Sequence, residues 1–293
     1  MRTNAANHRL QITLLVCLAM LAFAGNSLLC RMALKQTAMD PASFTSVRLL
    51  SGACTLWLLV RLWHGSVTVN AKQGGNWWSA VALFAYAAGF SFAYVGMSAA
   101  TGALLLFGAV QATMICYGLA NGERLRGLQV AGFLLALSGL VVLMLPGVAT
   151  PSLVNALFML GAGVAWGVYS LRGKRTQGYS VNDSIRVTAG NFARAAPMAL
   201  MLNLLLYGHA SVDALGIALA VGSGALASGL GYAIWYRVIP ELQATHAASV
   251  QLSVPVITAL GGVALLGETF TLTLMLTSTA ILGGIALVIW RRE

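Results

Sequence analysis

Charged side chains are scarce in this chain: only 8% of its 293 residues are Asp, Glu, Lys or Arg. Water-soluble globular domains carry roughly 25% charged residues, so the deficit excludes an ordinary soluble fold. In their place, 59% of the residues are hydrophobic and the mean hydropathy is +0.82. At about 20 residues per membrane-spanning helix, the chain has room for roughly ten spans with short loops. The composition therefore indicates a polytopic membrane protein that lies in a lipid bilayer.

Other absences narrow the chemistry. The chain has four cysteines, all in apolar segments and without C-x-x-C spacing, which argues against a disulfide framework or a metal site. It lacks the H-E-x-x-H and G-x-S-x-G motifs of metalloproteases and serine hydrolases. The seven acids all fall in predicted loops or at span ends, so no pair of buried carboxylates is expected. The sequence predicts no catalytic residue, no metal and no cofactor.

The net charge of +10 does not indicate nucleic-acid binding, because the cations occupy short loops between apolar spans instead of one basic face. Cytoplasmic loops of membrane proteins carry an excess of Lys and Arg. If the N-terminus is cytoplasmic, 13 of the 17 cations lie on cytoplasmic segments. Arg31 and Lys35 then lie outside, and Arg48 and Arg194 fall within spans. This distribution predicts a multi-pass protein with both termini in the cytoplasm.

Apolar segments separated by turn signals place five spans on each side of a short uncharged seam at residues 146–151. The spans are expected at Leu10–Leu29, Ser43–Leu62, Trp77–Gly96, Thr101–Leu119, Leu128–Leu145, Leu153–Leu171, Ser184–Tyr207, Asp213–Tyr236, Ala244–Leu266 and Leu272–Trp290. The predicted fold class is an all-α membrane protein of ten transmembrane helices.

Two of these spans resemble each other closely enough to indicate an internal duplication. Residues 100–123 read ATGALLLFGAVQATMICYGLANGE, and residues 244–268 read ATHAASVQLSVPVITALGGVALLGE. Each begins with Ala-Thr and ends with Gly-Glu. Because each copy would hold an odd number of spans, the second copy must be inverted in the membrane. We predict a first repeat over residues 1–147 and an inverted second repeat over residues 148–293, around a central cavity.

The ends of the two similar spans, Gly122-Glu123-Arg124-Leu125 and Gly267-Glu268-Thr269-Phe270, resemble the closing motif of the EamA-type repeats of the drug/metabolite transporter superfamily. Ser253-Val254-Pro255 falls near that family's proline. Within the superfamily the chain is most similar to the YddG aromatic amino-acid exporters. One departure is Gln111, which stands where a proline is common in the first repeat, so the two halves are not expected to bend alike.

This resemblance implies an exporter or facilitator of small metabolites in the bacterial inner membrane. Its substrates would be aromatic and other neutral amino acids, moved by alternating access through the central cavity. The cavity would be lined mostly by Trp77–Gly96, Thr101–Leu119, Asp213–Tyr236 and Ala244–Leu266. We expect a monomer, because two such repeats complete the fold in one chain.

Polar side chains in the middle of a span usually face a cavity or another helix, because lipid cannot solvate them. Gln111 and Gln251 are the leading candidates, since an amide offers both donors and an acceptor to a zwitterion. Ser253 lies beside Gln251, and Pro255 is predicted to break the helix and free backbone carbonyls. The alternative for each glutamine is an interhelical hydrogen bond, worth about 0.6 kcal/mol in membranes.

Aromatic residues recur at helical spacing on three predicted spans. They are Tyr86, Phe90 and Tyr94 on one span, Trp166 and Tyr169 on another, and Tyr232 and Trp235, with Ser228, on a third. Such stripes are usually packing or interfacial belts. Their number near mid-span nevertheless favours a cavity for flat side chains, with Tyr86 and Tyr232 lining it.

Three further polar residues have weaker signals. Asn26 is interpreted as a gate or a helix cap. Arg48 is expected to extend outward to the membrane surface, and Arg194 to pair or to extend in the same way. Neither arginine is expected to anchor substrate.

Two other interpretations stay open. One is export of other small metabolites or amphiphilic drugs, and the other is an intramembrane enzyme or receptor. Within transport, the spans hold no buried carboxylate that could relay protons, as proton-driven antiporters commonly do. We therefore expect facilitated transport down the substrate gradient.

Overall fold

The computed structural model describes residues 2–64, 74–122, 124–125, 127–145, 151–174, 181–242 and 250–289. All regular secondary structure in these ranges is helical. The main helices are α1 (Arg2–Gln36), α2 (Pro41–His64), α3 (Trp77–Tyr94), α4 (Ala99–Ala120), α5 (Gly127–Met144), α6 (Leu153–Lys174), α7 (Val181–Leu205), α8 (Ala214–Val221), η3 (Gly222–Leu230), α9 (Gly231–Val238), α11 (Ser253–Leu266) and α12 (Leu272–Ile289). The short 3-10 helices η2 (Tyr207–His209) and η4 (Ile239–Glu241) follow α7 and α9.

The predicted fold class, an all-α membrane protein of ten helices, is confirmed. Helices α8, η3 and α9 follow one another without a break and count as one span, so the described residues form ten long helices. Seven segments are long and apolar enough to cross a membrane, at Asn7–Gln36, Pro41–Leu62, Ala99–Ala120, Gly127–Met144, Leu153–Gly173, Ala214–Glu241 and Leu272–Ile289. The other three, α3, α7 and α11, are not among these segments, and α11 has only 14 residues.

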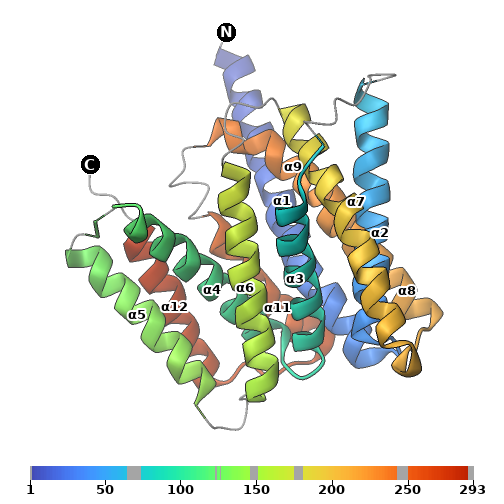
Figure 1. Ribbon diagram of the computed structural model, residues 1–293. Helices are drawn as coiled ribbons and strands as arrows, with labels where there is room; N and C mark the ends of the chain where they lie inside the picture. Colours follow the sequence, from blue (N-terminus) through green and yellow to red (C-terminus); the bar gives the residue numbers. More distant parts are fainter. Residues whose placement is uncertain are drawn as a thin grey trace.

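The bundle has a central part and two flanks (Figure 1). Helices α5 and α12 pack together along one side, and α2 packs against α7 and η3 on the other. Helix α6 packs against both α3 and α4 in the middle, so it brings the second half of the chain onto the first. The start of α1 and the end of α12 lie toward the same end of the bundle.

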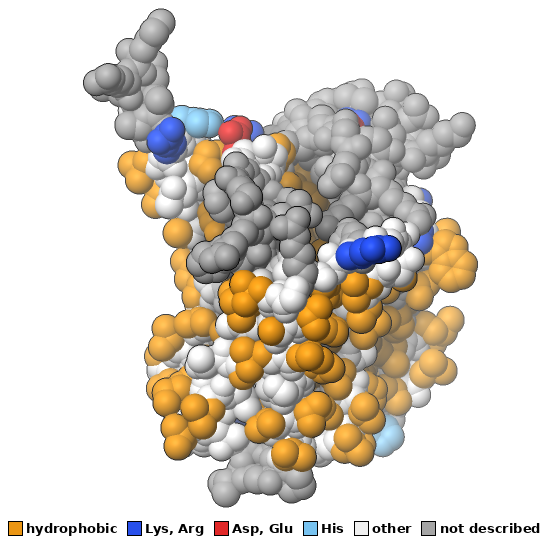
Figure 2. Space-filling view, turned by 90° about the vertical axis from the view of Figure 1, so that its left-hand side faces the viewer, with side chains coloured by type: hydrophobic (Ala, Val, Ile, Leu, Met, Phe, Trp, Pro, Cys, Tyr) orange, Lys and Arg blue, Asp and Glu red, His pale blue; other side chains and the backbone are white. Residues whose placement is uncertain are grey.

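The surface is that of a protein in lipid. Large apolar side chains are exposed along the helices, including Leu134 (58%) and Leu260 (67%). Exposed apolar surface on this scale is unfavourable in water. Figure 2 shows these hydrophobic side chains spread over one face, with the visible Lys and Arg gathered toward the end where α1 begins.

The glycine of each Gly-Glu pair adopts the left-handed conformation just after a helix. Gly122 follows α4 with φ +90°, and Gly267 follows α11 with φ +61°. Glycine reaches this left-handed conformation without the steric cost of a Cβ, and it commonly ends helices. After Gly267 the amide of Glu268 donates to the Gly262 carbonyl at 3.1 Å, which turns the chain back toward the bundle. Glu123, the first repeat's counterpart of Glu268, lies outside the described residues.

The break predicted at Pro255 takes the form of a helix start. The chain is in a turn at Leu252, and α11 begins at Ser253. Pro255 therefore lies in the first helical turn, where backbone N–H groups have no intrahelical acceptor and a proline removes no bond. The seam residues 146–150 and residues 243–249, with the expected start of this span at Ala244, lie outside the described residues.

The span expected as one α-helix over Asp213–Tyr236 contains nine residues of π-helix, η3. Glycines let this segment pack tightly on α2. A Cβ at Gly224 would collide with the carbonyl of Arg48 and the hydroxyl of Ser51, and one at Gly229 would press on Thr55 at 2.8 Å. Wide π turns often occur at functional sites. Here the wide turn and the missing side chains set the backbone of η3 directly against the middle of α2.

Asp40 fixes the start of α2. Its carboxylate accepts hydrogen bonds from the backbone amides of Ala42 and Ser43, both at 2.9 Å, and from that of Ser211 at 3.0 Å. Partial burial by itself raises the pKa of Asp40, but the hydrogen bonds from Ser43, Ser211 and Ala42 outweigh it and lower the pKa below its ordinary value. The carboxylate therefore holds the segment before α8 against α2.

An ion pair joins four helices at the end of the bundle away from the start of α1. The Nε of Arg31 on α1 donates to Oε1 of Glu268 at 3.2 Å, and the two side chains are 12% and 8% exposed. Arg31 Nη1 also donates to the carbonyls of Tyr94 (2.7 Å) and Val95 (3.0 Å). The amide of Ala99 donates to Oε2 of Glu268 at 2.8 Å. The pair thus ties α1 and the end of α11 to the α3–α4 turn.

We expect Glu268→Ala to destabilise the fold, because it leaves the Arg31 guanidinium and the Ala99 amide without their anionic partner. Removing one partner of a buried ion pair costs about 3 kcal/mol. The matched control is Glu241→Ala, since Glu241 is 49% exposed and its only ion pair among the described residues is with His8, at 3.5 Å. Its loss should cost less than about 1 kcal/mol. Unfolding midpoints in mixed detergent micelles measure both, and equal midpoints for the two variants would contradict the prediction.

Candidate functional site

Arg48 lies in the middle of the bundle and does not extend to the membrane surface. It is 2% exposed, so the expectation that it extends outward is wrong. The physical reason is the packing of α2: Gly224 of η3 contacts the Arg48 backbone from one side, and α3 receives the side chain on the other. A side chain can extend to the membrane surface only when it lies on the lipid-facing side of its helix.

Among the residues that the structure describes, the guanidinium of Arg48 has only neutral partners. Its Nη2 donates to the Tyr86 hydroxyl at 2.9 Å, and its Nε is 3.5 Å from Ser228 Oγ. Its Cζ lies 5.1 Å from the ring centroid of Tyr86 and 5.0 Å from that of Phe90. The third nitrogen, Nη1, is buried without a hydrogen-bond partner. A buried unsatisfied donor typically costs about 1–3 kcal/mol, and more when it is charged.

Two more residues extend this hydrogen-bond network. Ser223 Oγ donates to Asn26 Oδ1 at 2.7 Å, and Asn26 Nδ2 donates to the Tyr86 hydroxyl at 3.2 Å. Asn26, Tyr86 and Ser223 are 6%, 5% and 0% exposed. Asn26 is therefore part of a buried network rather than a helix cap. We call this network the Arg48 cluster; its members are Asn26, Arg48, Tyr86, Ser223 and Ser228.

An aromatic wall adjoins the Arg48 cluster. The ring of Trp166 on α6 lies 4.6 Å from that of Tyr86 on α3 and 5.4 Å from that of Tyr232 on α9. Phe23 on α1 reaches Tyr232 at 5.7 Å. We call seven of the connected rings the aromatic box; its members are Phe23, Tyr86, Phe90, Tyr94, Trp166, Tyr169 and Tyr232. Trp235, Phe192 and Tyr236 contact the box from outside.

The structure brings together most of the residues that the sequence singled out. Six of them are rings of the box, namely Tyr86, Phe90, Tyr94, Trp166, Tyr169 and Tyr232, and Ser228 meets Arg48. The box is closed. Five of its seven rings are buried, and only Phe23 and Trp166 are partly exposed.

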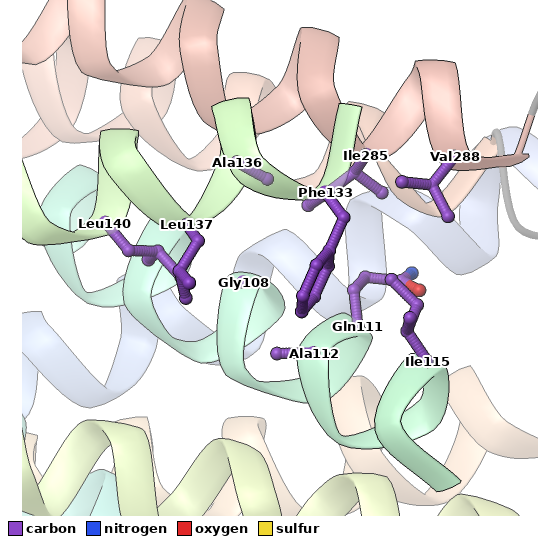
Figure 3. A pocket seen from close by; sticks show the side chains of 10 residues that line it. All are labelled: Gly108, Gln111, Ala112, Ile115, Phe133, Ala136, Leu137, Leu140, Ile285 and Val288. Carbon is purple, nitrogen blue, oxygen red and sulfur yellow. The ribbon is translucent and has the colours of Figure 1, made fainter. Parts of the chain in front are cut away.

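Gln111 and Ser253 have contacts other than the ring pairs of the box. Gln111 lines a small crevice between α4, α5 and α12, with Phe133 and Ile285 (Figure 3). Ser253 at the start of α11 donates to the Val250 carbonyl at 2.7 Å. No hydrogen bond among the described residues joins Gln111, Gln251 or Ser253 to the Arg48 cluster.

Arg194, the other arginine within a span, is satisfied by backbone oxygens. Its Nη1 donates to the carbonyls of Gly74 and Gly190, the latter at 2.9 Å, and its Cζ lies 5.9 Å from the Trp77 ring. Of the two expectations for Arg194, pairing within the protein and extension to the membrane surface, the structure shows pairing, with backbone carbonyls. The two arginines differ in kind: one has carbonyl acceptors, and the other retains an unpaired donor.

Sequence reasoning missed Arg48, Asn26 and Ser223 as members of the site. The available signal was the cost of a charge within an apolar span. Arg48 lies close to the expected start of its span, at Ser43, a position from which outward extension is also feasible. Asn26 and Ser223 are ordinary polar residues in long spans, and only the packing of α1 on η3 brings them together.

The arrangement is suited to binding. Flat apolar walls hold an aromatic or aliphatic group, and hydroxyl, amide and guanidinium groups beside them orient a polar group. Among the described residues no three His, Cys, Asp or Glu side chains gather where they could hold a metal ion. The site contains a permanent cation and neutral hydrogen-bonding groups.

Comparison with known proteins agrees with this architecture. The EamA-like transporter family matches residues 153–290. PA1977, an uncharacterized protein of Pseudomonas aeruginosa, is 54% identical over 276 residues, which are 94% of this chain and 93% of that protein. A protein of known crystal structure, 21% identical, covers 95% of this chain and 97% of its own with a TM-score of 0.66, a likeness of fold. The match places the second half of the chain in the EamA-like transporter family of the drug/metabolite transporter superfamily.

Proposed function

We propose that this transporter carries neutral amino acids, aromatic ones among them, out of the cell by alternating access, as the resemblance to the YddG exporters implies. The observation that carries the proposal is the aromatic box joined to the Arg48 cluster. Together they place a flat apolar wall beside groups that can hydrogen-bond to a polar group. A molecule such as phenylalanine needs both parts.

The position of the box supports alternating access. Its rings come from α1 and α3, within the proposed first repeat (residues 1–147), and from α6 and α9, within the proposed second repeat (residues 148–293). In transporters built from inverted repeats, the substrate binds between the repeats, and one rocks against the other. A site made by both repeats would open to one side when their faces separate.

The Arg31–Glu268 ion pair would close one end of the path between the box and the membrane surface. It joins α1 to the end of α11 and seals the α3–α4 turn against both. Opening that end would require the pair to part. The box below it is closed in this structure, so the described arrangement corresponds to a state shut at the end away from the start of α1.

We keep Gln251 and Ser253 as proposed substrate contacts. Helix α11 begins beside them, at Ser253, without a side-chain cap from Leu252, and the start of a helix carries a partial positive charge. Broken helices of transporters use such ends to bind anionic groups. Gln111, by contrast, lines the crevice against α5 and α12, which favours a role in helix packing over a substrate contact.

The topology proposal rests on charge. We propose a monomer in the bacterial inner membrane with both termini cytoplasmic. The start of α1 and the end of α12 lie toward one end of the bundle, and on the face in Figure 2 the cations gather toward that same end. An excess of Lys and Arg marks the cytoplasmic side.

Replacing both Tyr86 and Tyr232 with Ala should slow phenylalanine counterflow in proteoliposomes by about tenfold or more, because each ring contact is worth about 0.5–1.5 kcal/mol beyond its buried area. The matched control is Phe92→Ala with Phe158→Ala. These rings also pair between α3 and α6, at 5.8 Å, but make no ring contact with the box. Phenylalanine transport by the Tyr86 and Tyr232 double variant at the wild-type rate would refute the role of the box.

We also expect transport to proceed without proton exchange. The described acids Asp40, Asp183, Asp213, Glu241 and Glu268 all lie at helix ends or between helices, so the described spans hold no carboxylate in mid-membrane that could relay protons. Phenylalanine gradients should move substrate across proteoliposomes without a pH change reported by an entrapped dye. Substrate-driven acidification that an uncoupler abolishes would show proton coupling instead.

A further inference from the structure

We propose that the guanidinium of Arg48 binds the carboxylate of the transported molecule and thereby limits the substrates to carboxylates. This inference rests on the proposed function, because it assigns the chemistry of one half of the same site. It separates two ligand classes that an aromatic box alone would accept equally: organic anions and zwitterions on one side, and cationic or amide amphiphiles on the other.

The first argument is the unpaired nitrogen. Arg48 is 2% exposed, and its Nη1 is buried without a hydrogen-bond partner. A guanidinium has five N–H donors, and they are most often satisfied by carboxylates or backbone carbonyls. The guanidinium makes two hydrogen bonds, and the one from Nε to Ser228 Oγ is long, at 3.5 Å. The group therefore retains donor capacity for an incoming acceptor.

The second argument is charge. Arginine stays protonated in proteins, and a charge within the membrane usually pairs with an opposite charge or faces a water-filled cavity. No ion pair among the described residues includes Arg48. Tyr86 and Phe90 stabilise the cation through their ring faces, but they do not neutralise it. A carboxylate brought by the substrate would supply the missing negative charge.

The third argument is geometry. A carboxylate accepts two parallel N–H bonds from a guanidinium, which fixes its orientation as well as its position. Tyr86 lies next to both halves of the site: its hydroxyl accepts from Arg48 at 2.9 Å, and its ring is 4.6 Å from that of Trp166. A molecule with a carboxylate a few bonds from an aromatic ring can thus contact Arg48 and the box together once the rings part.

The Arg48 cluster holds no anionic group to pair with an ammonium ion. The Arg48 cluster contains hydroxyls and an amide but no carboxylate, and the Asn26 Oδ1 atom already accepts from Ser223. The positive charge of Arg48 also repels a cation. The carboxylate of an amino acid should therefore contribute more to binding than its amino group, and cationic drugs should be excluded.

Ligand analogues test this on the unaltered protein. Competition against labelled phenylalanine in counterflow would compare 3-phenylpropionate, phenylalaninamide and phenethylamine. We expect 3-phenylpropionate to compete within about tenfold of phenylalanine, and the amide and the amine at least about a hundredfold more weakly, because a site built for a polar group rejects analogues that lack it.

The outcomes separate the two proposals. If phenylalanine and its amide compete equally, the role of Arg48 is overturned while amino-acid transport stands. If 3-phenylpropionate is transported and no amino acid is, the proposed function fails while the carboxylate site stands. If neither phenylalanine nor 3-phenylpropionate is bound or moved, both fail.

Variants provide the second test. Arg48→Gln should lower the preference for 3-phenylpropionate over phenethylamine by at least about tenfold, and Arg48→Lys should retain part of it. The preference is a ratio measured on one sample, so it does not depend on how much of the variant folds. The matched control is Arg194→Gln, which removes a span arginine outside the site and should leave the preference unchanged. An unchanged preference in Arg48→Gln would overturn the proposal.

Discussion

The structure depends on holding one permanent positive charge in the interior of a membrane bundle. Arg48 cannot lose its proton at physiological pH and is 2% exposed. Its surroundings are arranged to tolerate it: two ring faces on α3, the Tyr86 hydroxyl, and Ser228 at the edge of hydrogen-bond reach. These contacts leave the charge unneutralised, so the same arrangement that stabilises the empty fold favours an anionic ligand. Stability and specificity thus follow from one interaction.

Close backbone packing makes that interaction possible. Helix η3 approaches α2 through Gly224 and Gly229, where a side chain would collide with α2. Its wide turn presents Ser223 to α1 and Ser228 to α2. Helix–helix association in membranes relies on such small residues, because lipid offers little hydrophobic driving force between helices. The glycine-rich composition of this span therefore serves the site directly.

The two Gly-Glu motifs lie at helix ends. Gly122 and Gly267 both end their helices in the left-handed conformation, as a duplicated Gly-Glu pair would require. At α11 the turn delivers Glu268 to Arg31, which closes the bundle at one end. This closure consists of a few polar contacts, whereas the box is made by rings from both halves of the chain.

The sequence by itself determined the ten helices, because a bilayer allows a lone polypeptide segment few structures other than an apolar helix of fixed length. It also determined which rings share a helix face, because the period of the α-helix relates Tyr86, Phe90 and Tyr94 without reference to any neighbour. Tertiary structure alone decided which neighbour each face meets. It turned Arg48 inward, joined Asn26 to Ser223 across 197 residues, and set Gln111 against α5 and α12. Periodicity describes a helix relative to its own axis, whereas the rotation of that axis in the bundle depends on packing between distant segments.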